Sequence, residues 1–434
     1  METPMIDLYR GDCLATLRNL PDNSVDSIVT DPPYGLSNTD PAKVQKALTA
    51  WVMGARDYVP EGKGFMGQAW DSFVPPPAVW DECFRVLKPG GHMAVFAGSR
   101  TQDLMGMSIR LAGFDLRDSV AWLYGSGFPK SLDVSKAIDK AAGAEREVIG
   151  TKLGRPGYSL ADNVNEGRAA YGKFTDAASE CAITGPATNE AKKWEGWGTA
   201  LKPGHEPIIL ARKPFPGTVA GNVQEHGTGA LNIDATRIGM SQEDAEFIRK
   251  KARPNTAGHE HIGGVMNRPA TPTVNVHAAG RWPANVILDE DQAAALDEQS
   301  GTIVDRNGGR GGWRKDGYVG GTTTTDVEST TYRDKGGASR FFYVAKAGKK
   351  ERPSYVDENG DTVSHPTVKP VALIRWLVRL ITPPGGTVLE PFAGTGTTGE
   401  AAALEGFACI MIERHEPYLP LIRARMDAVA ARNK

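Results

Sequence analysis

Short apolar runs and helix-spaced apolar positions follow one another along the first part of the chain. Residues 24–30 predict a buried strand, residues 79–87 carry apolar side chains at helical spacing, and residues 93–96 predict the next strand. Residues 114–123 alternate in part between polar and apolar positions, which favours a hairpin with residues 207–211. This succession of strands and helices is typical of an α/β fold.

The same kind of pattern returns at the other end of the chain. Residues 371–381 have helical spacing, residues 387–390 predict a strand, residues 397–404 a helix and residues 408–412 a second strand. We therefore expect a sheet assembled from both ends of the chain, in which residues 387–390 lie beside residues 27–30.

Between these two parts the periodicity is weaker. Residues 126–197 are rich in glycine, alanine and lysine and are expected to form an insertion. Residues 216–338 contain clusters of glycine, threonine, proline and asparagine, which predict long loops.

The composition is that of a globular protein. With 434 residues, 40% of them hydrophobic and 24% charged, the chain is long enough for an α/β core and a second module, and wholesale disorder is excluded. No apolar run approaches the ~20 residues that a membrane helix needs. The first residues lack the charged and apolar regions of a signal peptide, so we expect a cytoplasmic protein.

Neither the net charge nor the cysteines single out a ligand. A net charge of −2 argues against a strongly basic nucleic-acid binder, although a neutral total can conceal a basic cleft. The 4 cysteines are scattered, and His259-Glu260-His261 lacks the spacing of a zinc pair on a helix. We therefore expect no metal site.

Asp31-Pro32-Pro33-Tyr34 directly follows the strand predicted at residues 24–30. It places a carboxylate, a carbonyl and an aromatic ring at the carboxyl end of a strand, where open α/β sheets bind ligands. A planar ring that bears an amino group could stack on Tyr34 while its NH2 donates to Asp31 and to the Pro32 carbonyl. Taken alone, the same motif is more readily explained by an ordinary proline turn.

Phe392-Ala393-Gly394-Thr395-Gly396 joins a predicted strand to a predicted helix. A glycine turn of this kind can cradle a nucleotide-like cofactor, and the N–H groups at Thr397 and Thr398 favour a carboxylate. Glu413, at the end of the neighbouring predicted strand, is placed to accept ribose hydroxyls. Residues 394–399 also match the GxGxxG pattern of nicotinamide-dependent oxidoreductases, but that alternative leaves the proline motif unexplained.

With these two motifs in this order, the chain resembles the β group of the amino-methyltransferases of DNA, whose motifs have a circularly permuted order. Further stretches are similar to phage and prophage-type members of that family: residues 9–13, 20–26, 85–91, 198–203, 205–208, 281–285, 339–343 and 365–370.

The resemblance implies an α/β fold with a Rossmann-like methyltransferase sheet of seven mostly parallel strands and an inserted target-recognition region. It implies a site-specific methyltransferase that moves a methyl group from S-adenosyl-L-methionine to the N6 amino group of an adenine flipped out of double-stranded DNA. The N4 amino group of cytosine is the alternative; Asp31 favours adenine, because serine is typical of the cytosine enzymes there. Methylation of glutamine or RNA, and DNA binding without catalysis, are disfavoured by the motif order and by the intact Asp31 and Tyr34.

The resemblance also assigns roles to residues. The expected catalytic residues are Asp31, Pro32, Pro33 and Tyr34. The expected cofactor-binding residues are Asp12, Cys13, Asp31, Thr367, Lys369, Glu390, Phe392, Ala393, Gly394, Gly396, Thr397, Thr398 and Glu413. Of these, Asp12 is expected to accept from the adenine amino group of the cofactor, and Lys369 to meet its carboxylate.

Three segments follow from this assignment. Residues 1–215 are expected to be the N-terminal part of the catalytic domain, residues 216–338 the target-recognition region and residues 339–434 the C-terminal part of the catalytic domain. The residues expected to bind DNA are Arg237, Arg253, Arg268, Arg306, Arg310 and Arg314. We also expect a bacterial or phage-encoded homodimer, which would bury apolar residues such as Trp51, Val52 and Met53.

Overall fold

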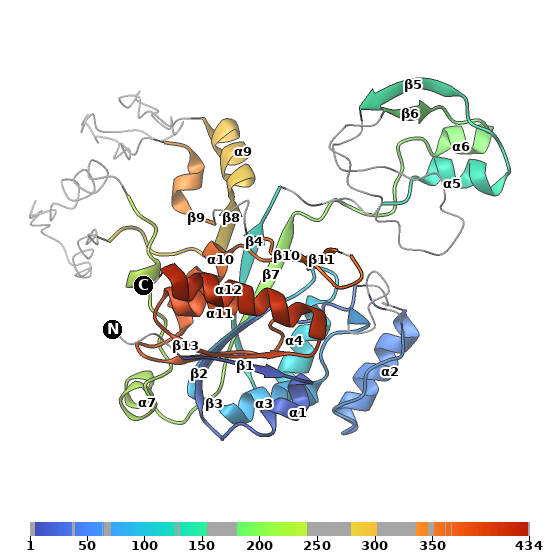
Figure 1. The fold of residues 1–434 in the computed structure, drawn as a ribbon. Coiled ribbons are helices and arrows are strands. Elements are labelled where there is room, and N and C mark those ends of the chain that lie inside the picture. The colour runs from blue at the N-terminus through green and yellow to red at the C-terminus, as the bar shows by residue number, and fades with distance from the viewer. Residues whose placement is uncertain are drawn as a thin grey trace, which may run out of the picture.

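A single large sheet forms the centre of the molecule (Figure 1). The computed structural model describes residues 5–36, 40–62, 64, 71–125, 127, 131–153, 180–240, 279–301, 336–345, 351–360, 362–365 and 367–432. In spatial order the strands of this sheet are β1 (Ile6–Arg10), β13 (Ala408–Glu413), β12 (Thr387–Glu390), β2 (Val25–Thr30), β3 (Leu87–Phe96), β7 (His205–Arg212), β4 (Asp115–Leu123), β8 (Val286–Asp289) and β9 (Tyr343–Ala345).

Most neighbouring strands in this sheet run parallel. Only β7 is antiparallel to its two neighbours, β3 and β4, which confirms the hairpin expected between residues 114–123 and 207–211. The expected mostly parallel α/β sheet is confirmed, but among the described residues it has nine strands where seven were expected, because β8 and β9 continue it beyond β4.

The two ends of the chain meet in the middle of the sheet. In the parallel pair of β12 and β2, Val388 lies beside Ser27 and Leu389 beside Ile28. This confirms the pairing expected between residues 387–390 and 27–30. It brings the carboxyl ends of β2 and β12, which precede the two sequence motifs, to the same edge of the sheet.

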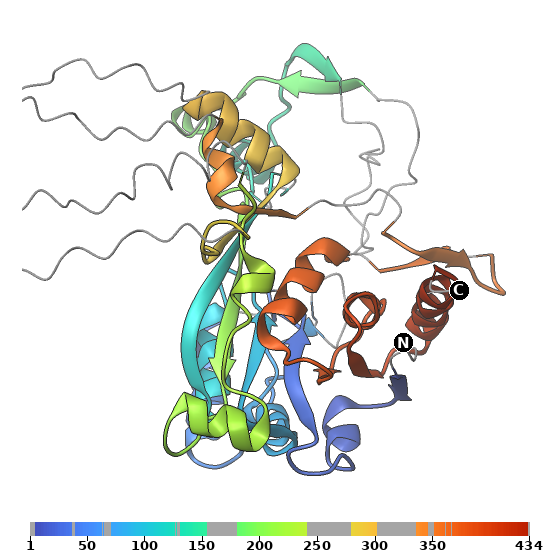
Figure 2. The same ribbon diagram turned by 90° about the vertical axis from the view of Figure 1, so that its left-hand side faces the viewer.

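Helices cover both faces of the sheet (Figures 1 and 2). Adjacent residues in β2 illustrate the arrangement, because Ile28 packs in one apolar core and Val29 in the other, both fully buried. Because helices cover β2 on both sides, every residue of the strand is buried, including the polar Asp26, Ser27 and Thr30. One core contains residues of α1 (Cys13–Leu17), α2 (Pro41–Val52), α3 (Pro77–Val86) and α4 (Gln102–Leu111), and the other contains residues of α10 (Val371–Ile381), α11 (Thr397–Leu404) and α12 (Leu419–Arg432).

The elements expected near the C-terminus are confirmed within one residue, since α10, β12 and α11 have the expected bounds and β13 runs to Glu413. The strand expected at residues 93–96 begins earlier. β3 starts at Leu87, directly after α3, and its register against β2 shifts between the pairs Val25–Leu87 and Ser27–His92. The extra residues form a bulge, in which Gly90 has a φ of 79°.

A small lobe lies apart from the central sheet at the ends of β4 and β7 (Figure 1, upper right). It contains α5 (Val134–Ala141), the antiparallel pair β5 (Val148–Leu153) and β6 (Glu180–Thr184), and α6 (Asn189–Lys193). Buried Asp139 organises it by accepting from Arg146 at 2.6 Å and from the amide of Thr188 at 3.0 Å. These elements lie in the segment expected to be an insertion.

Several elements between residues 216 and 345 pack on the central sheet or extend it. α7 (Val219–His226) packs against β3, and β8 and β9 are strands of the sheet. The other elements in the described part of this stretch are η3 (Asp234–Thr236), α9 (Glu290–Ser300) and η4 (Ala338–Phe341). Near the C-terminus, β10 (Ser354–Val356) and β11 (Thr362–Ser364) form a separate hairpin, and η5 (Glu416–Tyr418) precedes α12.

The end of α2 differs from expectation. Trp51 is 1% exposed, donates from its ring N–H to the Tyr58 carbonyl at 2.8 Å and packs edge-on against Phe73. It is therefore a core residue, and only Val52 and Met53 are available on the surface.

Two observations concern the described residues as a whole. No helix among them has the length and apolar character to cross a membrane. Nor does this part of the chain contain a group of three or more His, Cys, Asp or Glu side chains that could hold a metal ion. His259-Glu260-His261 lies outside the described residues.

Candidate active site

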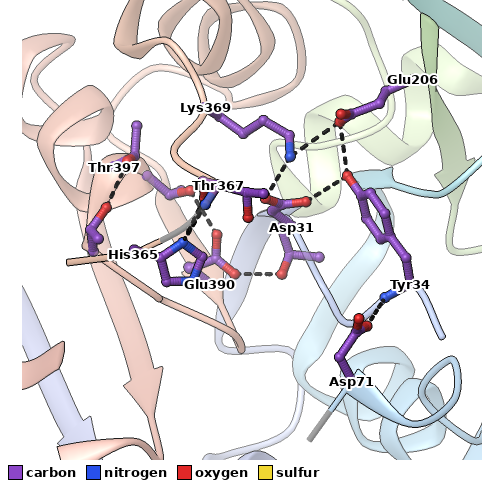
Figure 3. Close-up of polar contacts among 12 residues, drawn as sticks. Asp31, Tyr34, Asp71, Glu206, His365, Thr367, Lys369, Glu390 and Thr397 are labelled. Carbon is purple, nitrogen blue, oxygen red and sulfur yellow. Dashed lines mark hydrogen bonds and ion pairs between the residues drawn. The ribbon is translucent and has the colours of Figure 1, made fainter. Parts of the chain in front are cut away.

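The Asp31–Tyr34 motif lies at the carboxyl end of β2 (Figure 3). Buried Asp71 holds the turn, because its Oδ1 accepts from the backbone N–H of Tyr34 at 2.8 Å and of Gly35 at 3.0 Å. The Thr101 hydroxyl donates to the Tyr34 carbonyl at 2.7 Å. The backbone around Tyr34 is therefore fixed by the protein itself.

Four polar side chains meet beside this turn (Figure 3). Lys369 Nζ donates to Asp31 Oδ2 at 2.7 Å and lies 3.1 Å from Glu206 Oε2. The Tyr34 hydroxyl lies 2.7 Å from Asp31 Oδ1 and 3.0 Å from Glu206 Oε2. The Lys369 side chain is 7% exposed, whereas the Asp31 side chain is 25% exposed. Solvent therefore reaches the Asp31 carboxylate more readily than the ammonium group.

The charges of this network follow from its contacts. Burial raises the pKa of the Tyr34 hydroxyl well above its usual value, and the Asp31 and Glu206 carboxylates raise it further. Burial by itself lowers the pKa of Lys369, but the same two carboxylates outweigh it and raise that pKa. Tyr34 is thus a neutral donor and Lys369 a cation. Two carboxylates and one ammonium give a formal charge of −1, which suits a cationic ligand.

Glu390, the last residue of β12, lies beside Thr30, the residue that precedes the Asp31–Tyr34 motif, and is 2% exposed. It accepts from the hydroxyls of Thr30 and Thr398, the latter at 2.7 Å, and from the Phe392 amide at 3.0 Å. Burial raises the pKa of Glu390 to about 8, although these hydrogen bonds oppose the shift. Glu390 therefore ties β12 to β2 and to α11, and its expected contact with a cofactor stays a prediction.

The glycine turn joins β12 to α11 and is fastened to β13. Gly394 has a φ of 54°, and its N–H donates to Glu413 Oε2 at 2.7 Å. Gly396 has a φ of 78°, and a Cβ at this position would lie 3.0 Å from Ile422 of α12. We expected both glycines to make room for a cofactor. At Gly396 the structure supplies a different reason, which is the close approach of α12.

The end of β1 brings the N-terminal motif to the same edge. Gly11 donates from its N–H to the Glu413 carbonyl at 3.0 Å. Asp12 caps α1 through an acceptor bond of 3.1 Å, and Arg414 Nη1 lies 3.8 Å from its other oxygen. Burial raises the pKa of the neighbouring Cys13 to about 12, and Asp12 adds to the shift, so this thiol stays protonated.

An aromatic group borders the glycine turn. The rings of His365 and His415 pack edge-on against Tyr418, with centroid distances of 4.8 and 4.5 Å. A Cβ on Gly394 would lie 3.6 Å from His365 Nε2. His365 Nδ1 lies 2.6 Å from the Thr367 carbonyl, which fixes Thr367 beside the same ring.

The expected site residues separate into two groups. Asp31, Tyr34 and Lys369 share one network, and Gly394 and Glu413 share another at the ends of β12 and β13. Thr397 and Thr398 are buried at the start of α11. Lys369 was expected to meet the cofactor carboxylate; in the structure its ammonium is bound to Asp31 and Glu206.

Among the arginines expected to bind DNA, only Arg237 lies within the described residues. It donates to Asp234 at 2.8 Å and stacks over the Trp282 ring at 5.3 Å, and its side chain is 11% exposed. The arginines outside the described residues are Arg253, Arg268, Arg306, Arg310 and Arg314. The DNA contacts of all six stay predictions.

Glu206 and Asp71 are among the residues of the site that were missed in the sequence. Glu206 belongs to a stretch that carries the family resemblance, but nothing in the chain around it indicates that it faces Asp31 and Tyr34. That proximity arises from the antiparallel pairing of β7 with β3, in which Ile208 lies beside Phe96. Asp71 carried no sequence signal at all.

Comparisons with known proteins agree with this arrangement. A model of the N6 and N4 methyltransferases, described as DNA methylase, matches residues 25–424. The chain belongs to this DNA methylase family. The resemblance inferred from the two sequence motifs is therefore confirmed.

Among curated relatives, the type II methyltransferase M.HindIII of Haemophilus influenzae is 26% identical over 256 residues, which are 52% of this chain and 65% of that protein. The DNA adenine methyltransferase YhdJ of Escherichia coli is 39% identical over 67 residues, which are 15% of this chain and 23% of that protein. The chain thus spans less than two thirds of either relative.

Solved structures with some likeness include TTHA0409 of Thermus thermophilus, titled a putative DNA modification methylase. It is 16% identical, with coverage of 98% of this chain and 95% of that chain and a TM-score of 0.38. The cytosine-N4-specific PvuII DNA methyltransferase is 12% identical, with coverage of 99% and 93% and a TM-score of 0.39. At TM-scores this low, neither structure adds an argument on function.

Proposed function

We propose that the chain transfers a methyl group from S-adenosyl-L-methionine to the N6 amino group of an adenine in double-stranded DNA. The observation that carries the proposal is the parallel pairing of β12 with β2, because it sets the glycine turn next to the Asp31–Tyr34 motif. Bound at this edge, the cofactor supplies a methyl group already activated on a sulfonium.

The glycine turn and its neighbours fit such a cofactor. Glu413 holds the amides of Gly394 and His415, at 2.7 and 2.6 Å, and each of its oxygens keeps a lone pair for a ribose hydroxyl. Asp12 follows β1 on the far side of Glu413 and is partly exposed, as an acceptor for an adenine amino group must be. The formal charge of −1 around Asp31 favours a positive sulfonium nearby.

Asp31 carries the chemistry in this proposal. An exocyclic amine is a poor nucleophile, because its lone pair is delocalised into the ring. Asp31 and the Pro32 carbonyl accept its two N–H groups and turn the lone pair towards the methyl group, so positioning supplies much of the rate. As the N–C bond forms and the C–S bond breaks, the amine loses one proton, which Asp31 is placed to accept.

The target base must leave the helix to reach Asp31, because its amino group is otherwise inside the duplex. We propose that the flipped base stacks on the half-buried ring of Tyr34, whose backbone Asp71 and Thr101 already fix. Because the aromatic ring is already in position before the base binds, less conformational entropy is lost on binding.

Adenine is favoured over cytosine by the aspartate at position 31 and by the naming of YhdJ as an adenine methyltransferase. The test is transfer of tritium from labelled cofactor to duplex DNA, followed by digestion and separation of the nucleosides. We expect the label in N6-methyl-2′-deoxyadenosine. Label in N4-methylcytosine would establish the alternative base, and label only in RNA or protein would refute the proposal.

Target recognition is proposed to reside in residues 216–338, within the three-part division of the chain given above. Alanine substitution of a base-reading arginine would cost ~1–3 kcal/mol of binding and relax selectivity at one position. Substitution of a phosphate-binding arginine would weaken binding to all DNA sequences alike and make the affinity less dependent on salt concentration. If the whole arginine series leaves both unchanged, the insertion at residues 126–197 becomes the region to test.

Two further expectations belong to the same proposal. We propose a homodimer, to which the exposed Val52 and Met53 at the end of α2 contribute. The cytoplasmic location stays a prediction.

A further inference from the structure

Glu206 belongs to the polar network beside Asp31, and the proposed chemistry gives it no role. It lies near the start of β7, and its side chain is 19% exposed. Its Oε2 receives two donors, the Tyr34 hydroxyl at 3.0 Å and Lys369 Nζ at 3.1 Å. Both donors also serve Asp31, at 2.7 Å each. Glu206 and Asp31 therefore compete for the same two groups (Figure 3).

The Tyr34 hydroxyl has a single proton, so it donates to one carboxylate at a time. While that proton points to Asp31, it occupies a lone pair of Oδ1, the oxygen that Lys369 leaves open. An incoming amine needs a lone pair of Asp31. A second acceptor within reach of the hydroxyl allows Tyr34 to turn its proton away without leaving it unpaired in a buried place, which would cost ~1–3 kcal/mol.

The ammonium group poses a similar problem. A lysine bound to Asp31 alone would neutralise the carboxylate and weaken it as an acceptor of amine N–H groups. Lys369 is instead shared, so that its charge is divided between two carboxylates. Its Nζ also lies 5.3 Å from the Tyr34 ring centre and 5.1 Å from that of Phe96, which holds the ammonium in place.

We propose that Glu206 is a positioning residue for methyl transfer: by accepting the Tyr34 proton and sharing Lys369, it leaves Asp31 free to accept the N–H of the target amine. The inference rests on the proposed function. It concerns the reaction step and not the affinity for DNA, because Glu206 reaches the reacting atoms only through Tyr34 and Lys369.

The kinetic test compares Glu206→Gln, which keeps the shape and removes the charge, with Glu225→Gln as control. Glu225 is 75% exposed on α7 and lies in no part of the site. We expect Glu206→Gln to lower kcat by roughly tenfold to a hundredfold, as loss of an outer partner of a reacting group commonly does, with KM for DNA within about twofold. Glu206→Asp, which keeps the charge, should recover part of the loss. An unchanged kcat, or a loss confined to KM, would overturn the inference.

A double-mutant cycle tests the path through Tyr34. Tyr34→Phe keeps the ring for stacking and removes the hydroxyl. Glu206 then no longer accepts a hydrogen bond from residue 34, so this part of its effect on kcat is lost. We expect Glu206→Gln to reduce kcat less in the Tyr34→Phe background than in the wild type. Fully multiplicative losses would show that Glu206 does not act through this hydroxyl.

A spectroscopic experiment tests this inference independently of the proposed function, because it requires no methyl transfer. In protein labelled with 3-fluorotyrosine, the fluorine signal that is missing from Tyr34→Phe reports on residue 34. Loss of the carboxylate at 3.0 Å should shift that signal in Glu206→Gln and not in Glu225→Gln. If the wild type transfers no methyl group to DNA, the proposed function fails; an unmoved fluorine signal would overturn the inference whether or not transfer occurs.

Discussion

At the scale of single residues, the side chains that contact Asp31 also have other hydrogen-bond partners, which keep them in position without it. Lys369 keeps Glu206 as a partner at 3.1 Å when Asp31 is removed, and the turn around Tyr34 is fixed by Asp71 and Thr101. Substitution of Asp31 should therefore change the chemistry far more than the fold.

Asp31→Ala is expected to lower methyl transfer by roughly a hundredfold or more, since it removes a charged acceptor oriented at the target amine. Tritium transfer measures the loss, and thermal unfolding checks that the fold persists. Asp103→Ala, at an exposed position of α4, serves as control and should keep wild-type turnover. Turnover near the wild-type rate in Asp31→Ala would refute the assignment of this residue.

Glu390 should make stability depend on pH. Its pKa is raised from 4.5 to about 8 by burial, so between these values the folded protein binds a proton that the unfolded chain releases. Stability is then highest at the acid end of this window and falls as the pH rises through it, by at most ~1.4 kcal/mol per pH unit for one group.

Urea denaturation between about pH 5 and pH 8 checks this expectation, with Glu390→Gln flattening the decline. Glu405→Gln is the contrasting control. Although burial opposes it, hydrogen bonds from Arg379 and Arg375 lower the pKa of Glu405, so its titration lies at more acid pH. The Glu405 variant should be less stable throughout the window with an unchanged slope. An equal slope in wild type and Glu390→Gln would mean that Glu390 is ionised in the fold.

At the scale of elements, α11 begins and ends at glycines with nearly the same backbone. Gly396 precedes it with a φ of 78°, and Gly406 follows it with a φ of 80°. A Cβ on Gly396 would lie 3.0 Å from Ile422, whereas a Cβ on Gly406 would meet nothing within 4 Å. Substitution of the two glycines therefore separates two losses of stability: that from a left-handed backbone at a residue with a side chain, and that from a steric clash with α12.

Gly406→Ala is expected to lower the free energy of unfolding by about 1–2 kcal/mol, the cost of left-handed backbone for a residue with a side chain. Gly396→Ala should lose a further ~1–3 kcal/mol, because Ile422 must move to admit the methyl group. Chemical denaturation of both variants measures the difference. Equal losses would show that α12 yields freely and that Gly396 is needed for its backbone angle alone.

The elements that were predicted are those whose signal is local. The apolar spacing of residues 371–381 and the turn between residues 390 and 397 identify α10, β12 and α11 without any knowledge of the rest of the chain. The start of β3 was missed, because a bulge that contains Pro89, Gly90 and Gly91 looks like a turn in sequence. Trp51 was wrongly expected on the surface for a related reason. Its neighbours Val52 and Met53 are exposed, and no local pattern shows that Trp51 lies on the buried face of α2.

At the scale of the whole molecule, the site exists only because distant segments pair. Asp31 follows β2, Glu206 lies on β7 and Lys369 precedes α10, so three parts of the chain supply one network. The sequence motifs identified the first and the third as candidate site residues, but Lys369 was expected at the cofactor carboxylate and not beside Asp31. The second depends on which strand lies beside β3, and that is a property of the sheet and not of any local pattern.

The last prediction concerns assembly. Val52 is 69% exposed and Met53 is 81% exposed, so the end of α2 presents two adjacent large apolar side chains, which a homodimer would cover. We expect sedimentation at micromolar concentration to show a dimer, and Met53→Lys to shift it towards the 46.5 kDa monomer, because a partner would have to bury an unpaired charge. Leu201→Lys is the matched control: Leu201 is 92% exposed after the small lobe, and its substitution should leave the dimer intact. A wild-type protein that sediments only as the monomer, with and without DNA, would refute the dimer. A dimer that Met53→Lys leaves intact would place the interface away from the end of α2.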